Sequence, residues 1–157
     1  DSQLQKDAKD IIALHVMAII YSRIKEDAEL AGKYELRLDQ ANREIASKLA
    51  ERLEKDAATA PQTAAFLLKD AATAWLEADD KPKALAAAKK SAASPPESRT
   101  GLVYYWRDGL GDVFLATGEP TLAIPHFEAD LAATDRPGYK ERTAKKLAEA
   151  KAAAAKS

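Results

Sequence analysis

The chain has 157 residues, with 24 Lys or Arg against 25 Asp or Glu, so its formal net charge is only -1. This balance argues against a dedicated nucleic-acid binder, because such proteins usually carry a basic excess. The absence of cysteine excludes a disulfide framework, cysteine-ligated zinc and thiol catalysis, and two histidines are too few for a histidine-rich metal site. We therefore expect neither a metal nor another cofactor.

Helix-forming residues dominate the chain, and no stretch shows the period-two pattern of a strand. Prolines, glycines and short polar turns divide it into seven predicted helices. In chain order these are expected at residues 3–30, 34–58, 61–78, 82–93, 97–117, 120–134 and 139–155. Pro61 is expected as the first residue of the third helix, where a missing N–H costs no hydrogen bond. Short connections force neighbouring helices to run antiparallel, so the fold class should be all-α, built from helical hairpins.

The first predicted helix contains the longest apolar run, from Ile11 to Tyr21. This run is about half the roughly 20 residues that a membrane span requires, so we expect a buried helix and no membrane span. Gly32 should cap the end of this helix, and the two long helices around it should form a hairpin or one bent helix. The chain begins with Asp1 rather than Met, which favours an exported or periplasmic protein after signal cleavage, or a trimmed chain.

The second half of the sequence contains an internal repeat. Moving residues 67–96 forward by 39 positions places small or apolar residues on small or apolar residues, and a turn on a turn. The matched pairs are Ala71 with Leu110, Ala72 with Gly111, Trp75 with Phe114, Asp79 with Gly118, Ala84 with Ala123, Leu85 with Ile124 and Ala88 with Phe127. Gly111 and Ala123 are expected where two helices approach closely, and chance recurrence in an alanine-rich chain is the alternative.

The run Leu110-Gly111, Phe114, Gly118, Ala123 and Phe127 resembles the tetratricopeptide repeat, a helix–turn–helix motif of about 34 residues. The preceding stretch is similar but weaker, with alanine in place of Leu-Gly and an aspartate at the turn. The resemblance covers a little over half of the chain, and it implies a short superhelix of stacked hairpins.

On this resemblance the chain is one domain over residues 1–157. Its parts would be a long N-terminal hairpin at 1–60, repeats at 61–98 and 99–137, and a capping helix at 138–157. Residues 1–60 show no clear motif, so they are either a degenerate repeat or a separate hairpin. The spacing of 39 implies about five additional residues per repeat compared with the motif. We expect them at the start of the helix at 97–117.

In tetratricopeptide arrays the first helix of each pair lines a concave groove that contacts a partner. The resemblance therefore implies a set of partner-binding residues at Lys69, Thr73, Tyr105, Asp108, Asp112, Tyr139, Arg142 and Lys146, with Leu76, Glu77 and Leu115 on the same face. Within each helix these positions recur every three or four residues, so they share one face. A merely solvated face is the alternative. Some family members also hold a peptide's terminal carboxylate with lysines and arginines, but Asp112 would repel a carboxylate here.

The densest aromatic cluster is Tyr104-Tyr105-Trp106. Consecutive helix residues point about 100° apart, so at least one of the three should be exposed or lie between repeats, and an exposed one would be a good anchor for a partner. We favour the other interpretation, that all three pack against the N-terminal hairpin. His15 and His126 lack a second histidine at metal-binding spacing and are expected to be structural.

No catalytic constellation stands out, so we expect a protein without enzymatic activity. The favoured function is a protein-interaction module that binds a partner peptide or protein of unknown identity through a concave helical groove. The alternative is a structural or oligomerising protein that self-associates, as a homodimer, through the apolar run at 11–21.

Overall fold

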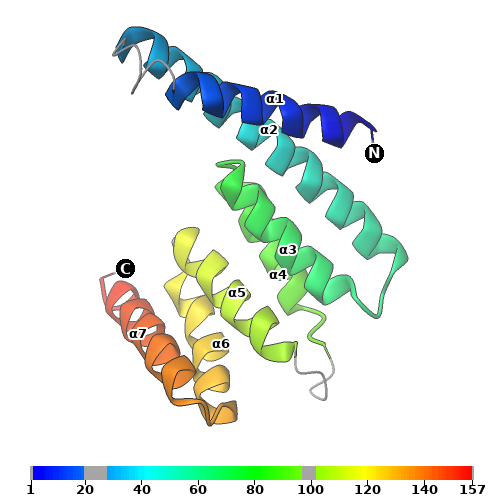
Figure 1. Cartoon of the computed structure of the whole chain (residues 1–157). Helices are drawn as coiled ribbons and strands as arrows, with labels where there is room; N and C mark the ends of the chain where they lie inside the picture. Colours follow the sequence, from blue (N-terminus) through cyan, green and yellow to red (C-terminus); the bar gives the residue numbers. More distant parts are fainter. Residues whose placement is uncertain (1, 20–27, 97–101, 157) are drawn as a thin grey trace. The chain divides into compact units, whose positions relative to one another are not determined.

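The computed structural model describes residues 2–19, 28–96 and 102–156 of the chain. In this part of the chain all regular structure is helical (Figure 1). The helices are α1 (Ser2–Ile19), α2 (Ala28–Thr59), α3 (Ala64–Glu77), α4 (Lys81–Ala92), α5 (Val103–Ala116), α6 (Pro120–Ala133) and α7 (Pro137–Ala154). The prediction of an all-α fold is therefore confirmed. No helix within these ranges is long and apolar enough to cross a membrane.

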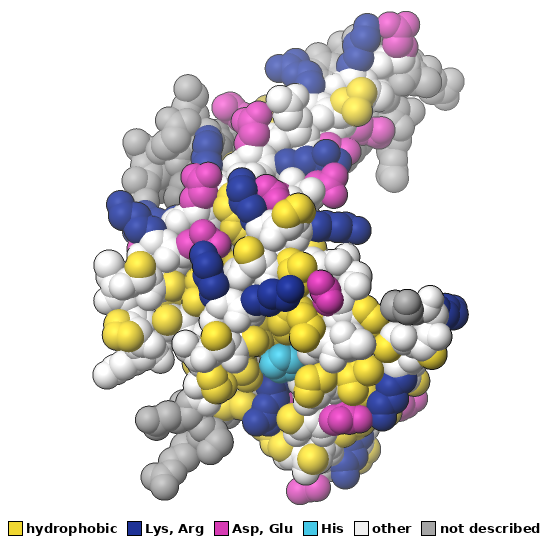
Figure 2. Space-filling view, turned by 180° about the vertical axis from the view of Figure 1, so that it is seen from behind, with side chains coloured by type: hydrophobic (Ala, Val, Ile, Leu, Met, Phe, Trp, Pro, Cys, Tyr) yellow, Lys and Arg dark blue, Asp and Glu magenta, His cyan; other side chains and the backbone are white. Residues whose placement is uncertain are grey.

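The chain divides into two compact units, Asp1–Lys48 and Leu49–Ser157. The boundary between them falls inside α2, whereas the sequence placed the first boundary at residue 60. The first unit contains α1 and the larger part of α2. Basic and acidic side chains are interspersed along α2 (Figure 2), and Lys33 pairs with Glu29 one turn earlier at 2.7 Å. Such pairs support a helix that is long and mostly polar.

Two predictions for the first unit need correction. Gly32 lies inside α2 and does not end a helix, because good helix formers on both sides outweigh the roughly 1 kcal/mol that one glycine costs. The apolar run is only partly buried, since Ala18 is buried while Ile12 is 62% and Val16 45% exposed. The last two residues of that run, at positions 20 and 21, lie outside the described residues.

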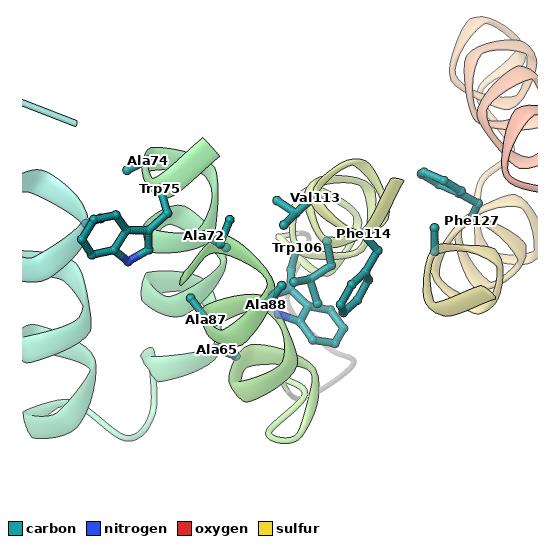
Figure 3. Close-up of a cluster of buried hydrophobic side chains, with 14 of the residues drawn as sticks. Ala65, Ala72, Ala74, Trp75, Ala87, Ala88, Trp106, Val113, Phe114 and Phe127 are labelled. Carbon is teal, nitrogen blue, oxygen red and sulfur yellow. The ribbon is translucent and has the colours of Figure 1, made fainter. Parts of the chain in front are cut away.

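The second unit consists of the end of α2, two helical hairpins and α7. Hairpin α3–α4 packs against α5, and α7 packs against α6. In Figure 1, α3, α5 and α7 lie toward the viewer with α4 and α6 behind them. The core between these helices combines many alanines with a few large side chains, of which Trp106, Val113 and Phe114 all come from α5 (Figure 3). Small residues bring the helices close together, and the large ones fill the remaining space.

The turns of the two hairpins have the same hydrogen bonds, 39 residues apart. Asp79 and Gly118 both adopt positive φ, at 63° and 82°. The N–H of Asp80 donates to Trp75 O at 2.9 Å, and the N–H of Glu119 donates to Phe114 O at 2.8 Å. This is the pattern of a Schellman motif, in which a left-handed residue ends the helix. The turn match predicted from the sequence is thus confirmed.

Close packing at Gly111 is also confirmed. A Cβ atom added there would lie 2.4 Å from a ring carbon of Phe127 on α6, a distance that real Cβ contacts do not reach. Ala123, on the facing side of the hairpin, is completely buried. The small residue on α5 therefore makes room for an aromatic ring on α6.

The predicted starts of the second and third helices, at residues 34 and 61, are wrong, since α2 already begins at Ala28. Pro61 lies in a turn, and α3 begins three residues later after Thr63. Helix α5 begins at Val103, which is 39 residues after the start of α3 at Ala64. The additional residues of the longer repeat were expected at the start of this helix, from residue 97. Residues 97–101 lie outside the described residues.

Candidate functional site

Two cavities lie on the side of the second unit that α3, α5 and α7 form, which we call the inner face. The α5–α7 cavity has a volume of about 590 Å³ and is lined by Tyr104, Tyr105, Asp108, Ala133, Thr134, Asp135, Arg136, Tyr139 and Arg142. The α3–α5 cavity has a volume of about 370 Å³ and is lined by Lys69, Thr73, Leu76, Tyr105, Asp108, Gly109, Asp112, Val113 and Ala116. Tyr105 and Asp108 line both cavities, so α5 forms the ridge between them.

Lys69 lies beneath the ridge. Its side chain is only 3% exposed and pairs with Asp70, and its ammonium lies 3.3 Å from the centroid of the Tyr105 ring. The Tyr105 hydroxyl donates to Asp70 at 2.8 Å. Gly109 makes this arrangement possible, because a Cβ there would lie 2.6 Å from the Lys69 Cδ. Lys69 therefore supports Tyr105 from below, and its contact with a partner stays a prediction.

A second group of charges joins α5 to α7. The Lys146 ammonium donates to Asp108 at 2.9 Å and to Asp112 at 2.6 Å. Burial opposes the charge on Lys146, but the hydrogen bonds with both carboxylates outweigh it and raise its pKa. Arg142 lies 3.8 Å from Asp108, and its guanidinium lies 4.7 Å from the centroid of the Tyr139 ring. Four of the residues predicted from the sequence are thus brought together in one ion-pair network with Tyr139 beside it.

Asp112 is the more exposed carboxylate of this network. Burial raises the pKa of its carboxyl group, although the Lys146 hydrogen bond acts in the opposite direction. Its side chain is 50% exposed, while that of Asp108 is 18% exposed. The more exposed of the two carboxylates is therefore the one that an approaching molecule meets first.

The side chains of the three consecutive aromatic residues, Tyr104, Tyr105 and Trp106, contact three different helices. Trp106 is buried and donates to Ser91 of α4 at 2.8 Å, and Tyr104 donates to Ala133 O at the end of α6. Tyr105 points toward α3 and is 54% exposed. The expectation of at least one exposed aromatic is confirmed. The favoured interpretation, that all three pack against the N-terminal hairpin, is wrong.

The remaining predicted residues differ in how much they contribute to the cavities. Thr73 is exposed, lines the α3–α5 cavity and donates its hydroxyl to Lys69 O at 3.2 Å. Leu76 and Leu115 are half-buried against the core, and Glu77 is exposed and lines neither cavity.

Sequence reasoning missed several lining or supporting residues. Asp70 was overlooked because it follows Lys69 directly, and an ion pair between chain neighbours has no periodic signal. Thr134 and Arg136 were overlooked because they belong to the connection before α7. The proline and glycine at the start of α7 were the available signal that this connection is short and fixed in place.

Asp130 on α6 is a second unusual feature. It is completely buried, and neither carboxylate oxygen has a hydrogen-bond partner among the described residues. Burial raises its pKa to about 7, with Arg107 and Lys146 acting against the shift and Asp108 adding to it. The hydroxyl of Thr143 on α7 is likewise buried without a partner. Polar groups without partners therefore accompany the packing of α6 against α7.

His126 packs against two aromatic rings, and its structural role stays a prediction. Its ring stacks on Phe114 at 5.6 Å between centroids and meets Trp106 edge-on at 5.5 Å. Burial lowers its pKa, and the charge of Arg107 adds to this effect. Among the described residues no group of three or more His, Cys, Asp or Glu side chains has an arrangement that could hold a metal ion.

None of the family models, curated proteins and solved structures compared with this chain matches it. The geometry of the inner face is therefore the basis for assigning a function.

Proposed function

We propose that the protein is a non-enzymatic interaction module that binds an extended peptide segment of a partner across its inner face. The observation that carries this proposal is the pair of adjacent cavities that share Tyr105 and Asp108. An extended chain places successive side chains several ångströms apart, so neighbouring pockets can each receive one.

The composition of the face also supports this function. Tyr105 is exposed and held by Lys69 and Asp70, which makes it a rigid aromatic anchor of the kind that dominates interface energetics. The surrounding polar groups are already arranged by cross-helix ion pairs, so less ordering is needed on binding. The repeated hairpins are, within this proposal, a tetratricopeptide-like array whose first helices present the face.

The test uses a random dodecapeptide display library panned against the intact protein, followed by affinity measurements on the selected peptides. We expect Tyr105→Ala combined with Arg142→Glu to weaken binding by tenfold or more, because the first change removes the anchor and the second reverses a charge in the α5–α7 cavity. Lys90→Glu is the control, since Lys90 is exposed on α4 and lines neither cavity. Circular dichroism must first show an unchanged fold. Equal binding by the folded double variant would refute peptide binding across the inner face.

Self-association through α1 is a second candidate, and one observation favours it. Ile12 and Val16 lie one turn apart on the same face of α1 and are both well exposed. A second copy could cover this stripe. Light scattering after size exclusion should then show a dimer that Ile12→Lys with Val16→Lys converts to a monomer. A monomer at every concentration of the parent protein would contradict this candidate.

A further inference from the structure

Beside the α3–α5 cavity, two lysines are less exposed than one carboxylate partner of each. The side chain of Lys69 is 3% exposed and that of Lys146 is 22% exposed. Asp70 and Asp112 are more exposed, at 37% and 50%, whereas Asp108, the other partner of Lys146, is 18% exposed. A molecule that enters the α3–α5 cavity therefore meets the carboxylate of Asp112 before it meets the ammonium groups of Lys69 and Lys146.

Three carboxylates and three cations face one another here, but the cations are not shared equally among the carboxylates. Lys146 is shared between Asp108 and Asp112, and Arg142 reaches Asp108 only at 3.8 Å. The hydrogen bond from Lys146 uses the Oδ2 atom of Asp112. The other oxygen of that carboxylate receives no hydrogen bond from the part of the chain that the structure describes. A further N–H donor can therefore bind there without displacing Lys146.

The walls of the α3–α5 cavity suit a long aliphatic stem. Leu76, Val113 and Ala116 contribute apolar surface, and the ring of Tyr105 closes one side. Lysine and arginine side chains combine such a stem with a charged end that seeks an acceptor. A carboxylate or phosphate would instead approach Asp112 and find both nearby lysines already paired.

We propose that the α3–α5 cavity accepts a lysine or arginine side chain of the bound peptide, with its charged end on Asp112 and its stem against Leu76 and Tyr105. This proposal rests on the proposed function, and it specifies the chemistry of the partner as a basic peptide segment. The preference for a basic side chain comes from the local placement of Asp112, because the net charge of the whole chain is only -1.

The experiment compares two matched carboxylate-to-amide variants. Asp112→Asn removes the proposed acceptor, and Glu128→Gln is the control. The two side chains are 50% and 51% exposed, and each pairs with a lysine of α7, at 2.6 Å and 2.8 Å. Both variants remove one surface charge and one ion pair, but only Asp112 lines the cavity. The probes are peptides selected from the dodecapeptide library and copies in which each lysine or arginine in turn is replaced by norleucine.

We expect the selected peptides to share a basic residue. Asp112→Asn and replacement of that residue should each weaken binding by about tenfold or more, and the two losses should not add. Glu128→Gln should leave the affinity unchanged. Thr73→Lys is an independent variant, because it places a competing ammonium at the rim of the cavity and should also weaken binding.

Two results would overturn the proposal in distinguishable ways. In the first, the selected peptides lose affinity with Tyr105→Ala, but they lack a shared basic residue or bind equally well to Asp112→Asn. This result would support peptide binding at the inner face and refute the basic side chain in the α3–α5 cavity. A library that yields no binding peptide, or peptides insensitive to both Tyr105→Ala and Asp112→Asn, would reject the groove together with its occupant.

Discussion

The hairpins α3–α4 and α5–α6 have matching turns but different residues at one buried position. Ser91 and Asp130 are 39 residues apart and both are completely buried. The Ser91 hydroxyl donates to Ala65 O at 2.6 Å and accepts from Trp106 Nε1 at 2.8 Å, so it joins α4 to both α3 and α5. The carboxylate of Asp130 has no such partners among the described residues. The same position in the repeat therefore carries a hydrogen-bonded polar side chain in one hairpin, and in the other a polar side chain without partners among the described residues.

The hairpins also differ in how their helices approach. In the first hairpin Ala72 corresponds to Gly111 and Ala88 to Phe127, by the shift of 39 residues. The first pair is small on both sides, whereas the second combines a missing side chain with a ring. The backbone pattern of the repeat is thus compatible with two different distributions of volume. The following changes test these differences, beginning with the one of largest expected effect.

Replacing Phe127 by alanine should cost about 3–5 kcal/mol of unfolding free energy, because a completely buried ring leaves a cavity. Gly111→Ala alone should cost about 1–3 kcal/mol, since its Cβ overlaps the ring. In the Phe127→Ala background the same Gly111→Ala change should become neutral or stabilising, because the pair then matches Ala72 and Ala88. Denaturant unfolding of the four proteins measures this reversal. A Gly111→Ala variant as stable as the parent would contradict the packing described here.

Removing the Ser91 hydroxyl should cost about 2 kcal/mol, because it leaves Ala65 O and the Trp106 N–H buried without partners. Ser94→Ala is the control, since Ser94 is exposed just beyond the end of α4 and should change stability by less than about 0.5 kcal/mol. Thermal melts of both variants provide the measurement. Equal melting temperatures would show that the serine does not join the helices.

Local chemistry explains what the sequence predicted well. The positions of the helices in the second unit followed from helix periodicity and turn residues, both of which act within a few residues. The match of Asp79 with Gly118 worked because a left-handed turn residue must be glycine or a short polar side chain. Tyr105 was recognisable because three consecutive helical aromatics cannot all be buried on one face.

What could not be predicted depends on contacts between distant residues. Lys69 read as an exposed cation, and only its passage over Gly109 on another helix makes it buried. Asp130 has no local sign of being unusual, since its burial results from the packing of α6 with its neighbours.

Replacing Asp130 by asparagine should change how stability depends on pH. The folded carboxyl has a pKa of about 7, against an ordinary value of 3.8. Between these values the folded state keeps a proton that the unfolded state has released, so raising the pH lowers the free energy of unfolding until about pH 7. The Asp130→Asn variant lacks this loss. We expect it to gain about 1–2 kcal/mol relative to the parent between pH 5 and pH 8.

The comparison with the parent isolates Asp130 from the other groups that face it, which are Arg107, Asp108, Tyr139 and Lys146. Asp135→Asn is the control, because that carboxylate is fully exposed five residues further on. Urea unfolding at a series of pH values gives the curves. Parallel curves for the parent and Asp130→Asn would show that this buried position is not a source of pH dependence.

The smallest effect concerns the two turns. Gly118→Asp gives the second turn the residue that the first has at Asp79. A Cβ at Gly118 meets no atom within 4 Å, so the only cost is the left-handed backbone, about 1 kcal/mol. Gly138→Ala is a control of opposite sign, since Gly138 lies in the first turn of α7, also with open space around it, and alanine should stabilise the helix by up to about 1 kcal/mol. Thermal melts that show a lower midpoint for Gly118→Asp and a higher one for Gly138→Ala would establish that the α5–α6 hairpin depends on the left-handed residue at its turn. An unchanged midpoint for Gly118→Asp would mean that the turn can change its conformation at no cost. The left-handed residue would then not be required in the α5–α6 hairpin.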